Sequence, residues 1–560
     1  MRNNKQLIEC VPNFSEGRDM EVINQITNAI SSVEGVRLLN VDPGKATNRT
    51  VVTFVGEPEA VIEAAFRAIA KAGELIDMRQ HKGEHPRMGA TDVCPLIPIA
   101  GISLEQTAEY AKQLAKRVGE ELSIPVYCYE AAQPDKSRSN LSVIRAGEYE
   151  GFFKKIKDPN WKPDFGPDEF DPNRGATVVG ARDFLIAYNV NLNTTSTRRA
   201  NSVAFDIREA GRVKMENEKK VLDEFGNPVI IPGTLKSVKA IGWFIEEYGI
   251  AQISMNLTNI NVTPLHIAFD EACKKANERG LRVTGSELVG LIPLKSITDA
   301  GKYFLLKQNK STGVSEKELI EIAIRSMGLN ELSPFNPNEK IIEYMLEDNN
   351  AKKLIDNNLR DFANITASES PAPGGGSVAA YLGVLGVSLA TMVANLSSHK
   401  KGWDQRWKEF GDQAEKGQQL KDKLLKLVDA DTASFNAIMN AYSLPKSTSE
   451  EKAIRDKAIQ DATKKAIEVP MEVMLTSLES MSLIRSMAET GNPNSVSDAG
   501  VGALCARSAI MGAYLNVKIN CAGCQDADYV RTVLEKGLGM EQTAMETERE
   551  ILAIVNSKIK

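Results

Sequence analysis

The hydrophobic pattern of the chain changes once, close to residue 346, and this change constrains the fold more than any other feature. Before that point, apolar runs of strand length alternate with amphipathic helical stretches, which predicts an α/β or α+β part. From about residue 351 onward, nearly every segment has helical periodicity and strong helix formers, which predicts an all-α helical bundle. A chain of 560 residues also exceeds what one hydrophobic core normally organises.

Two stretches of the first part share one outline. Residues 35–78 and 242–293 each begin with a strand, a turn and a second strand, followed by a helix that starts at Pro58 or Pro264. Proline is suited to the first turn of a helix. We therefore predict two similar subdomains, each an open sheet backed by helices on one face. The expected division is residues 1–180 and 181–346 for these subdomains, 347–352 for a linker and 353–560 for the helical domain.

Composition excludes several classes of protein. The chain has 68 Lys and Arg against 74 Asp and Glu, which gives no electrostatic reason to expect a nucleic-acid partner. Its 7 cysteines are an odd and sparse set that does not resemble a disulfide framework. The first residues lack the apolar core of a secretory signal. These features predict a cytoplasmic protein.

Residues 370–398 contain no charged side chain over 29 positions, which is long enough to cross a bilayer. However, 11 of the 22 residues from 377 to 398 are Gly, Ala, Ser or Thr, which gain little from contact with lipid. Small residues let neighbouring helices approach closely. We therefore expect a buried bundle helix and no membrane span. Proline and glycine predict helix breaks at residues 370–376, 443–445, 469–470 and 491–493, and hence five or more helices.

Two of the four histidines, His81 and His85, lie together in the segment HKGEHPRMGATD. The letters HKGEH satisfy a zinc-binding pattern, but Gly83 and Pro86 disfavour the helix that this pattern requires. We therefore expect no metal site. A loop histidine titrates near about pH 6.5 and is suited to moving protons, although it could instead cap a turn.

Three further features are candidates for chemistry. Asp42 follows an apolar strand, where it could hold an imidazole nitrogen or simply form a turn before Pro43. Asp431 falls on the apolar stripe of its predicted helix while Asp429 points away, so Asp431 is either a buried proton shuttle or a solvated residue at the stripe edge. A glycine-rich helix start could receive an anionic group; its residues are Gly374, Gly375, Gly376 and Ser377.

The remaining motifs are less specific. Residues 158–174 are rich in proline, which predicts an irregular, rigid loop that serves either in binding or as a connector. Cys521 and Cys524 form a C-x-x-C pair, but neither a second pair for zinc nor a redox context accompanies them. We interpret both cysteines as packing or helix-end residues.

Taken together, the motifs are far more specific than any one alone. They include CVPNFSEGR, VDPGKATNRTVVTFVG, LIDMRQHKGEHPRMGATDVCP, IRAGEYEG, DFGPDEFDPNRGAT, PAPGGGSVAA, LVDADTASFNAIM, GNPNSVSDAG and YLNVKIN. With them the chain resembles, essentially from end to end, the bifunctional formimidoyltransferase-cyclodeaminase family of histidine degradation.

The resemblance implies an enzyme with two activities. The first part would transfer the formimino group of N-formimino-L-glutamate to N5 of tetrahydrofolate. The second would close the ring to 5,10-methenyltetrahydrofolate and release ammonia. Tetrahydrofolate or its polyglutamates would be carried substrates, with no metal and no redox cofactor, and the chain would form a homo-oligomer. Two alternatives remain open: N-formyl-glutamate as the donor, or a helical part that only binds folate or oligomerises.

The resemblance also implies roles for individual residues. His85 matches the catalytic histidine of the transferase, Asp42 its supporting carboxylate and Asp431 the cyclodeaminase carboxylate. The family's folate segment falls on Gly166, Pro167, Asp168, Glu169, Phe170, Asp171, Pro172, Asn173, Arg174 and Gly175. Of these, Asp168, Glu169, Asp171 and Arg174 differ from the family pattern.

Overall fold

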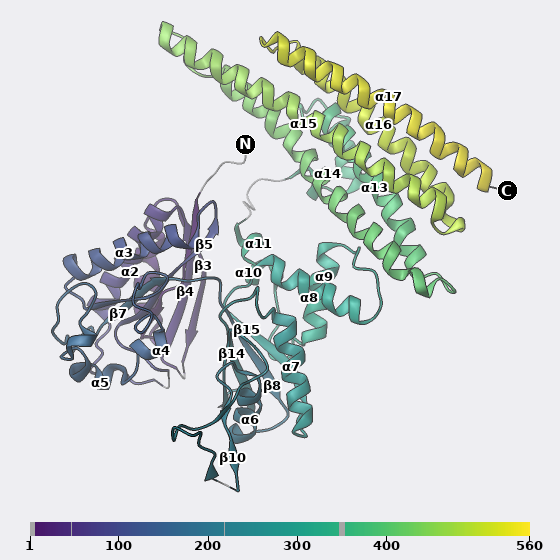
Figure 1. Ribbon diagram of the computed structural model, residues 1–560. Coiled ribbons are helices and arrows are strands. Elements are labelled where there is room, and N and C mark those ends of the chain that lie inside the picture. The colour runs from purple at the N-terminus through teal and green to yellow at the C-terminus, as the bar shows by residue number, and fades with distance from the viewer. Residues whose placement is uncertain (1–5, 46, 84, 218, 347–352, 560) are drawn as a thin grey trace. The chain divides into compact units, whose positions relative to one another are not determined.

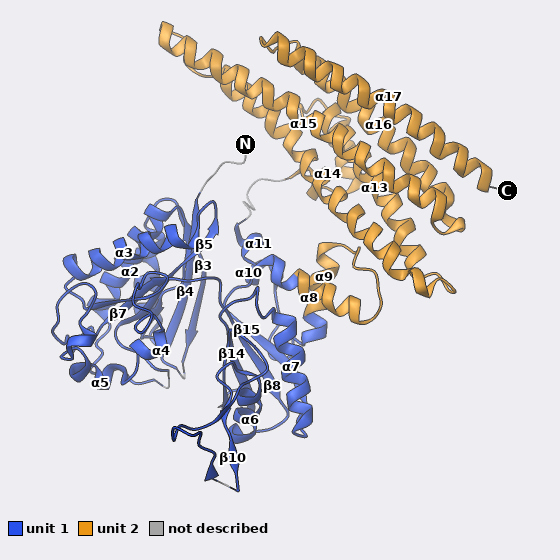
Figure 2. Ribbon diagram, viewed as in Figure 1, with its two compact units in different colours: residues 1–297, 324–347 blue, residues 298–323, 348–560 orange. Residues whose placement is uncertain are grey.

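A computed structural model describes residues 6–45, 47–83, 85–217, 219–346 and 353–559 (Figure 1). The chain divides into two compact units (Figure 2). Unit 1 comprises Met1–Ile297 and Ile324–Glu347, and unit 2 comprises Thr298–Ala323 and Asp348–Lys560. The predicted linker at 347–352 lies outside the described residues.

The first subdomain of unit 1 is built on a seven-stranded mixed sheet. Its strands are β1 (Leu7–Cys10), β2 (Asn13–Phe14), β3 (Val36–Gly44), β4 (Arg49–Gly56), β5 (Thr91–Ala100), β6 (Val126–Glu130) and β7 (Thr177–Ala181). Their order is β1-β4-β2-β5-β7-β6, and β3 pairs with β4. Strand β7 runs parallel to β5 and β6, whereas the other pairs are antiparallel. Helices α1 (Met20–Ser31), α2 (Pro58–Leu75) and α3 (Leu104–Glu121) pack on this sheet and complete its core.

The second subdomain is smaller and entirely antiparallel in its main sheet. The order is β13 (Val238–Ile245), β14 (Ile250–Leu257), β8 (Ile186–Leu192) and β15 (Val283–Val289). Helices α6 (Thr197–Ile207) and α7 (Leu265–Glu278) pack against it. The predicted strand–turn–strand–helix outlines are confirmed as β3-β4-α2 and β13-β14-α7, with Pro58 and Pro264 at the two helix starts.

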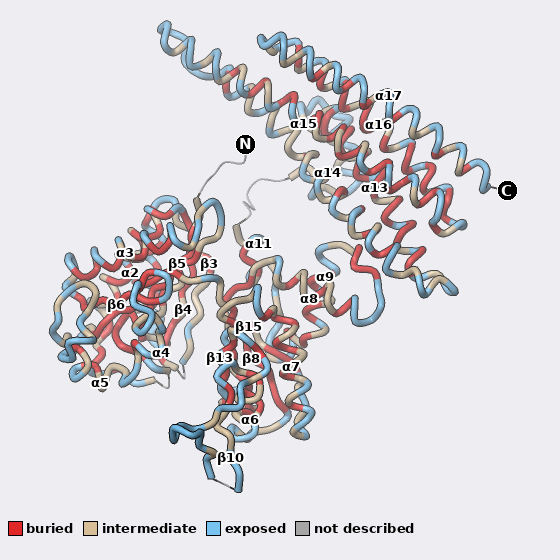
Figure 3. The backbone as a smooth tube through the Cα atoms, viewed as in Figure 1, coloured by how far each residue is buried: buried red, intermediate tan, exposed pale blue. Residues whose placement is uncertain are grey.

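Unit 2 is a bundle of long helices, as predicted. They are α12 (Leu359–Thr366), α13 (Gly375–Ser398), α14 (Trp407–Tyr442), α15 (Ser449–Thr490), α16 (Val496–Cys521) and α17 (Ala527–Lys558). Helices α13 to α17 share one hydrophobic core (Figure 3). Cys521 ends α16 and Cys524 packs on that core, so both are packing and helix-end residues.

The predicted break at residues 469–470 is wrong, because α15 continues through Pro470. Proline removes one backbone hydrogen bond and crowds the preceding turn, which destabilises a free helix by about 3 kcal/mol. Here Pro470 is buried, and its neighbours Ile467, Met471 and Met474 belong to the bundle core. Packing of this helix face therefore offsets the defect that the local sequence alone signals.

Helix α13 is the one described helix long and apolar enough to cross a membrane, and 61% of its most apolar window is buried within the bundle. Its buried residues include Ala380, Val387 and Ala394, which pack in the shared core. The prediction of a buried bundle helix is confirmed.

Residues 298–323 belong to unit 2 although they follow the second sheet in sequence. They comprise most of α8 (Leu294–Lys307), most of α9 (Glu316–Met327) and the connection between them. Within unit 2, Lys302 Nζ and Thr312 Oγ1 donate to Glu415 of α14 at 2.5 and 2.8 Å. Ser311 Oγ donates to Asn395 Oδ1 of α13 at 2.7 Å. These polar contacts attach the α8–α9 connection to the bundle.

Candidate functional sites

The two clustered histidines occupy different environments on the connection between α2 and β5. His81 is buried, with Nε2 at 2.8 Å from the Asn48 carbonyl oxygen and Nδ1 accepting from Arg87 Nε at 3.2 Å. Both of its ring nitrogens are therefore used by the fold. His85 is partly exposed, and only its Nδ1 is engaged, at 2.7 Å from the Pro86 carbonyl oxygen.

This single contact fixes the tautomer of His85. A carbonyl oxygen can only accept, so Nδ1 must carry the proton and Nε2 must present a lone pair. Nε2 makes no hydrogen bond within the described chain. His85, and not His81, therefore has the arrangement of a general base.

A buried charge cluster lies beside His85. Asp92 of β5 is fully buried and binds Arg49 Nη1 at 2.5 Å and Arg145 Nε at 3.1 Å, with a second contact to Arg145 Nη2. Burial and the nearby Arg49 and Arg145 lower the pKa of His85 to about 4, against the opposing effect of Asp92. The ring is therefore held in its neutral form at neutral pH.

Asp42 is not part of this cluster. It lies in β3 opposite Val51, and its described contacts include no hydrogen bond to His85. Burial raises the pKa of Asp42, an effect that Lys340 opposes and Glu287 reinforces. The carboxylate that acts electrostatically on His85 is Asp92, which comes from the strand that follows the histidine loop.

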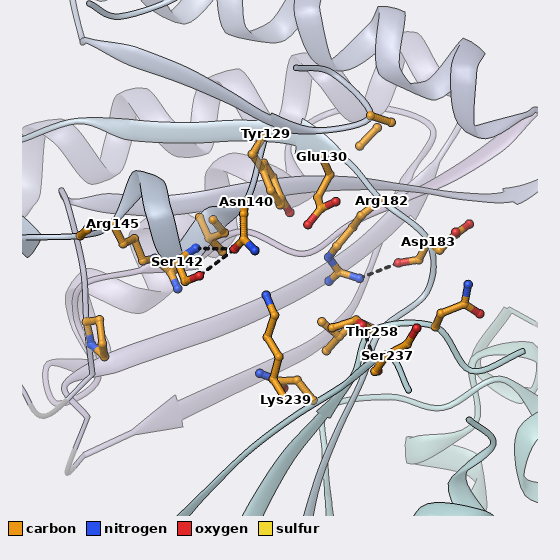
Figure 4. A pocket seen from close by; sticks show the side chains of 18 of the residues that line it. Tyr129, Glu130, Asn140, Ser142, Arg145, Arg182, Asp183, Ser237, Lys239 and Thr258 are labelled. Carbon is orange, nitrogen blue, oxygen red and sulfur yellow. Dashed lines mark hydrogen bonds between the residues drawn. The ribbon is translucent and has the colours of Figure 1, made fainter. Parts of the chain in front are cut away.

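A cavity of about 680 Å³ adjoins this region within unit 1 (Figure 4). Pro86 and Arg145 line it close to His85, although the imidazole itself is not part of the wall. The side chains of Lys239 and Arg182 point toward its middle, with Tyr129 on the wall opposite Lys239. Its other polar lining includes Asn140, Ser142, Ser237, Asn256 and Thr258. Three cations, Arg145, Arg182 and Lys239, and three carboxylates, Glu130, Glu148 and Asp183, line the cavity. Together with the neutral hydrogen-bonding groups, this mixed lining suits a charged polar ligand whose anionic groups meet the cations.

The predicted folate segment, residues 166–175, is folded against the histidine loop and does not line this cavity. Ala90 N donates to the Arg174 carbonyl oxygen at 2.9 Å, and Gly89 pairs with Gly175 in an isolated bridge. A Cβ at Gly175 would lie 2.2 Å from the Met88 carbonyl oxygen, so this position requires glycine.

The side chains of the same segment are largely occupied by the fold. Asp171 caps the turn by accepting from the backbone N–H of Asn173 and Arg174, and it also pairs with the Arg174 side chain at 2.6 Å. Phe170 packs near Tyr149 and Phe152. Asp168 is exposed beside Lys162. In the free protein these residues form a rigid connector, and their contacts with folate stay a prediction.

A second candidate site lies in unit 2, where the glycine-rich start of α13 meets Asp431 of α14. Ser377 Oγ donates to Asp431 Oδ2 at 3.1 Å. A Cβ at Gly376 would lie only 2.1 Å from Asp431 Oδ1, so glycine is needed for the carboxylate to approach. Burial raises the pKa of Asp431, and hydrogen bonding to the Ser377 side chain and backbone partly opposes this. Two features predicted separately therefore form one site.

The geometry corrects two details of those predictions. The anion at the start of α13 is Asp431 itself, so Gly376 and Ser377 hold a protein carboxylate. In addition, the predicted apolar stripe of α14, which included Val428 and Phe435, is interrupted after Val428, because Phe435 is 45% exposed. Asp431 is thus partly buried by the facing helix, while Asp429 accepts from the Leu354 N–H at 2.6 Å.

A cavity of about 140 Å³ adjoins Asp431. Its wall includes Gly374 to Gly376 from α13, Thr432 and Phe435 from α14, and Asn516 and Asn520 from α16. The amide groups of Asn516 and Asn520 donate to backbone oxygens at 2.9 and 2.7 Å, which fixes their orientation. The site combines a carboxyl group of raised pKa with oriented amides, which suits proton transfer to a nitrogen-rich ligand.

Several residues of the two sites were not singled out from the sequence. Arg49, Asp92 and Arg145 lie inside quoted motifs, and Asn516 and Asn520 lie inside YLNVKIN. Nothing in local periodicity indicates that these residues meet, because they come from distant segments. Among the described residues, no group of three or more His, Cys, Asp or Glu side chains is placed to hold a metal ion.

Comparison with known proteins covers both units. Family models for the formiminotransferase domain match residues 7–182, as its N-terminal subdomain, and residues 187–347. The formiminotransferase-cyclodeaminase model matches residues 358–537. The chain is 44% identical to mouse formimidoyltransferase-cyclodeaminase over 522 residues, which is 93% of each chain.

Two relatives correspond to one part of the chain each. Glutamate formimidoyltransferase of Thermoplasma acidophilum is 41% identical over 317 residues, 56% of this chain and 96% of that protein. Methenyltetrahydrofolate cyclohydrolase of Methylorubrum extorquens is 36% identical over 201 residues, 36% of this chain and 97% of that protein.

An α/β unit with a histidine beside a polar, charged cavity, joined to a helical unit with a carboxyl group beside a second cavity, defines an enzyme with two centres. The match to formimidoyltransferase-cyclodeaminases over nearly the whole chain identifies the family. The chain belongs to the formimidoyltransferase-cyclodeaminase family, and the resemblance seen in its motifs is confirmed.

Proposed function

We propose that the two centres catalyse consecutive one-carbon reactions. Unit 1 transfers the formimino group from N-formimino-L-glutamate to N5 of tetrahydrofolate, with His85 as the catalytic residue. Unit 2 closes the ring to 5,10-methenyltetrahydrofolate and releases ammonia, with Asp431 as the catalytic residue. The relatives that correspond to a single part of the chain support a division of the two reactions between the two units.

The observation that carries the first assignment is the free Nε2 lone pair of a neutral His85 beside a large cavity with a charged, polar lining. Attack of N5 on the amidine carbon produces a tetrahedral intermediate. The N5 proton must then be removed, and the glutamate nitrogen must be protonated before it leaves. One imidazole nitrogen can accept the first proton and deliver the second, which contributes about 10²- to 10⁴-fold.

Asp42 and the segment from Gly166 to Gly175 are proposed to take up their roles only when the substrate is bound. Asp42 makes no contact with His85 here, so its support of the histidine would require the bound substrate. The connector at 166–175 is hydrogen-bonded to the histidine loop, which keeps a folate contact there close to the transferred group.

In ring closure, the catalytic group must act as a proton donor. When N10 attacks the formimino carbon, the departing nitrogen must be protonated to leave as ammonia. A carboxyl group whose pKa is raised by burial retains a proton closer to neutral pH than an ordinary aspartate, so Asp431 is suited to this donation. Asn516 and Asn520 are placed to hydrogen-bond the ligand nitrogen atoms.

We further propose that the chain acts as a cytoplasmic homo-oligomer. Large apolar side chains are exposed on helices α13 and α16, which pack against each other: Leu385, Met392, Leu396, Val501, Leu504, Leu515 and Ile519. Apolar surface of this kind is typical of protein–protein contacts. Light scattering of the purified protein measures the oligomeric state directly, and a monomer at micromolar concentration would contradict the proposal.

The overall function is tested with the purified full-length chain, tetrahydrofolate and N-formimino-L-glutamate. We expect stoichiometric formation of ammonia and the absorbance of the methenyl product. N-formyl-L-glutamate serves as the comparison donor in the same assay. Faster turnover of the formyl donor, or product formation without ammonia, would overturn the assignment.

A further inference from the structure

The charge cluster beside His85 contains more positive than negative charge. Asp92 is the single carboxylate that the described contacts give to both Arg49 and Arg145, so two guanidinium groups share one anion. Asp92 is fully buried, and the side chains of Arg49 and Arg145 are only 8% and 14% exposed. Such a cluster carries one positive charge that water screens poorly.

The two arginines are held differently. Arg49 is enclosed by the sheet, where its Nη1 binds Asp92 and its Nε donates to Asn13 Oδ1 at 3.1 Å. Arg145 binds Asp92 through Nε and Nη2, and it also lines the cavity of about 680 Å³. Its Nη1 has no hydrogen-bond partner within the described chain, so a residue that lines the cavity keeps a donor available to a ligand.

We propose that Arg145 binds a carboxylate of the glutamyl donor, and that this anion, by balancing the cluster, raises the proton affinity of His85. The inference rests on the proposed transferase function and deepens it. Asp92 is then a positioning residue that aims Arg145, while Arg145 recognises the substrate. Asn140 lies on the same cavity wall, where Ser142 Oγ donates to its Oδ1 at 2.7 Å and orients the amide, so Asn140 Nδ2 can complete the hydrogen bonds of the carboxylate.

This coupling has a chemical purpose. The groups that act on His85 are Arg49 of β4, Asp92 of β5, Arg145 at the end of α4 (Leu141–Ile144) and the Pro86 carbonyl. Burial and the one uncompensated positive charge hold the pKa of His85 at about 4, so the ring stays neutral but is a weak base. A bound carboxylate moves the pKa toward the ordinary value of about 6.5, where a histidine accepts and returns protons most effectively. The base is therefore strengthened only when the donor is present.

The direct test is the pKa of His85, measured by NMR on protein with isotope-labelled histidine. The full chain has 4 histidines, so the resonances are few, and a His85→Gln variant assigns them. N-acetyl-L-glutamate mimics the donor without an amidine to transfer, and p-aminobenzoyl-L-glutamate mimics the folate tail. We expect the donor mimic to raise the pKa of His85 and the tail mimic to leave it unchanged.

Arg145→Gln is the informative variant, because it leaves Asp92 paired with Arg49 and removes only the excess charge. Asp92→Asn would instead strand two buried guanidinium groups, so misfolding of that variant is expected. In Arg145→Gln, the pKa of His85 should start higher and show no further rise with the donor mimic, and the mimic should bind about 10- to 100-fold more weakly. Arg138→Gln is the matched control, since it removes a half-buried arginine paired with Asp164 and should preserve both responses.

The proposal fails if the donor mimic binds without moving the pKa of His85, if it does not bind, or if only the folate-tail mimic moves this pKa. It also fails if Arg145→Gln responds as the wild type does. None of these results depends on turnover. If the wild-type enzyme transfers the formimino group while the pKa of His85 does not respond to the donor mimic, the proposed coupling is wrong and the proposed function still holds.

Discussion

The two candidate centres use their surroundings in opposite ways. His85 lies on an irregular loop, where burial and two arginines lower its pKa to about 4. Asp431 lies within a long helix, where burial raises its pKa against one serine contact. Burial displaces both groups toward their neutral forms, but nearby arginines add to the displacement of His85, whereas no charged group among the described residues contributes to that of Asp431. The first centre should therefore respond to changes of charge as well as of burial, and the second mainly to changes of side-chain volume.

Loss of either catalytic group gives the largest expected effects and separates the two centres. His85→Ala should lower formimino transfer by about 10²- to 10⁴-fold, because the proton relay is lost. Initial rates with N-formimino-L-glutamate measure this. His399→Ala is the matched control, since His399 is exposed at the end of α13 and should transfer normally. Equal losses of transfer activity in both variants would contradict the assignment of His85 as the catalytic histidine.

The corresponding change in unit 2 is Asp431→Asn, which keeps the side-chain size and removes the titrating group. Ring closure should fall by about 10²- to 10⁴-fold while transfer continues, so 5-formimino-tetrahydrofolate should accumulate. Product analysis by chromatography detects it. Asp429→Asn is the control, because Asp429 binds the Leu354 backbone N–H and lies outside the cavity wall. Retained ring closure in Asp431→Asn would assign the proton donor elsewhere.

Gly376→Ala tests whether the second centre depends on the close approach of the Asp431 carboxylate to the start of α13. The added Cβ would lie 2.1 Å from Asp431 Oδ1, so the carboxylate must move and ring closure should fall by at least about tenfold, equivalent to about 1.4 kcal/mol. Steady-state rates with supplied 5-formimino-tetrahydrofolate measure the effect. Gly539→Ala is the control, because no atom lies within 4 Å of its Cβ position in helix α17.

The pH dependence should distinguish the centres more subtly. A base with a pKa of about 4 remains neutral well below pH 6.5, so kcat/KM for transfer should decline only as the pH falls toward about 4. The contribution of His85 to the stability of the folded protein also decreases as the pH is lowered. The unfolded chain binds a proton at His85 near pH 6.5 and the folded chain only near pH 4, so this residue's contribution to stability falls as the pH is lowered between these values. An acid limb near pH 6.5 for kcat/KM would contradict the assigned surroundings.

Ser377→Ala should have the smallest effect. It removes the hydrogen bond to Asp431 Oδ2, a loss of about 0.5 to 1.5 kcal/mol, and thereby raises the pKa of Asp431 further. The pH profile of ring closure should shift to higher pH with a rate change of only several-fold. A shift to lower pH would show that Ser377 does not stabilise the ionised carboxylate.

The sequence predicted more of the second centre than of the first. Helical periodicity placed Asp431 on the inner side of α14, and glycine before a long helix marked the start of α13. Both signals are local, although their meeting at Gly376 is a tertiary fact. By contrast, the surroundings of His85 come from Arg49, Asp92 and Arg145 on three separate elements, and no local pattern joins them.

Because local patterns do not report contacts between distant segments, the structure also differs from, or adds to, several other predictions. Pro470 signals a helix end locally, but bundle packing carries α15 through it. Asp42 stands near the end of its strand as expected and makes no described hydrogen bond to His85, so its supporting role stays a prediction, while the sheet adds Asp92 beside that histidine. The proline-rich segment was expected to be irregular and is, but only the fold reveals that the Arg174 side chain binds the Leu122 carbonyl at the end of α3 and that its backbone pairs with the histidine loop. Local residue preferences predicted the elements, whereas contacts between distant segments decided the sites.

The central claim is that two separate centres in one chain perform successive reactions. It is tested most directly by supplying 5-formimino-tetrahydrofolate to the folded His85→Ala variant and following methenyl product and ammonia. The account predicts ring closure at the wild-type rate in a protein that no longer transfers the formimino group. Loss of ring closure together with transfer, in a variant whose circular dichroism matches the wild type, would contradict it.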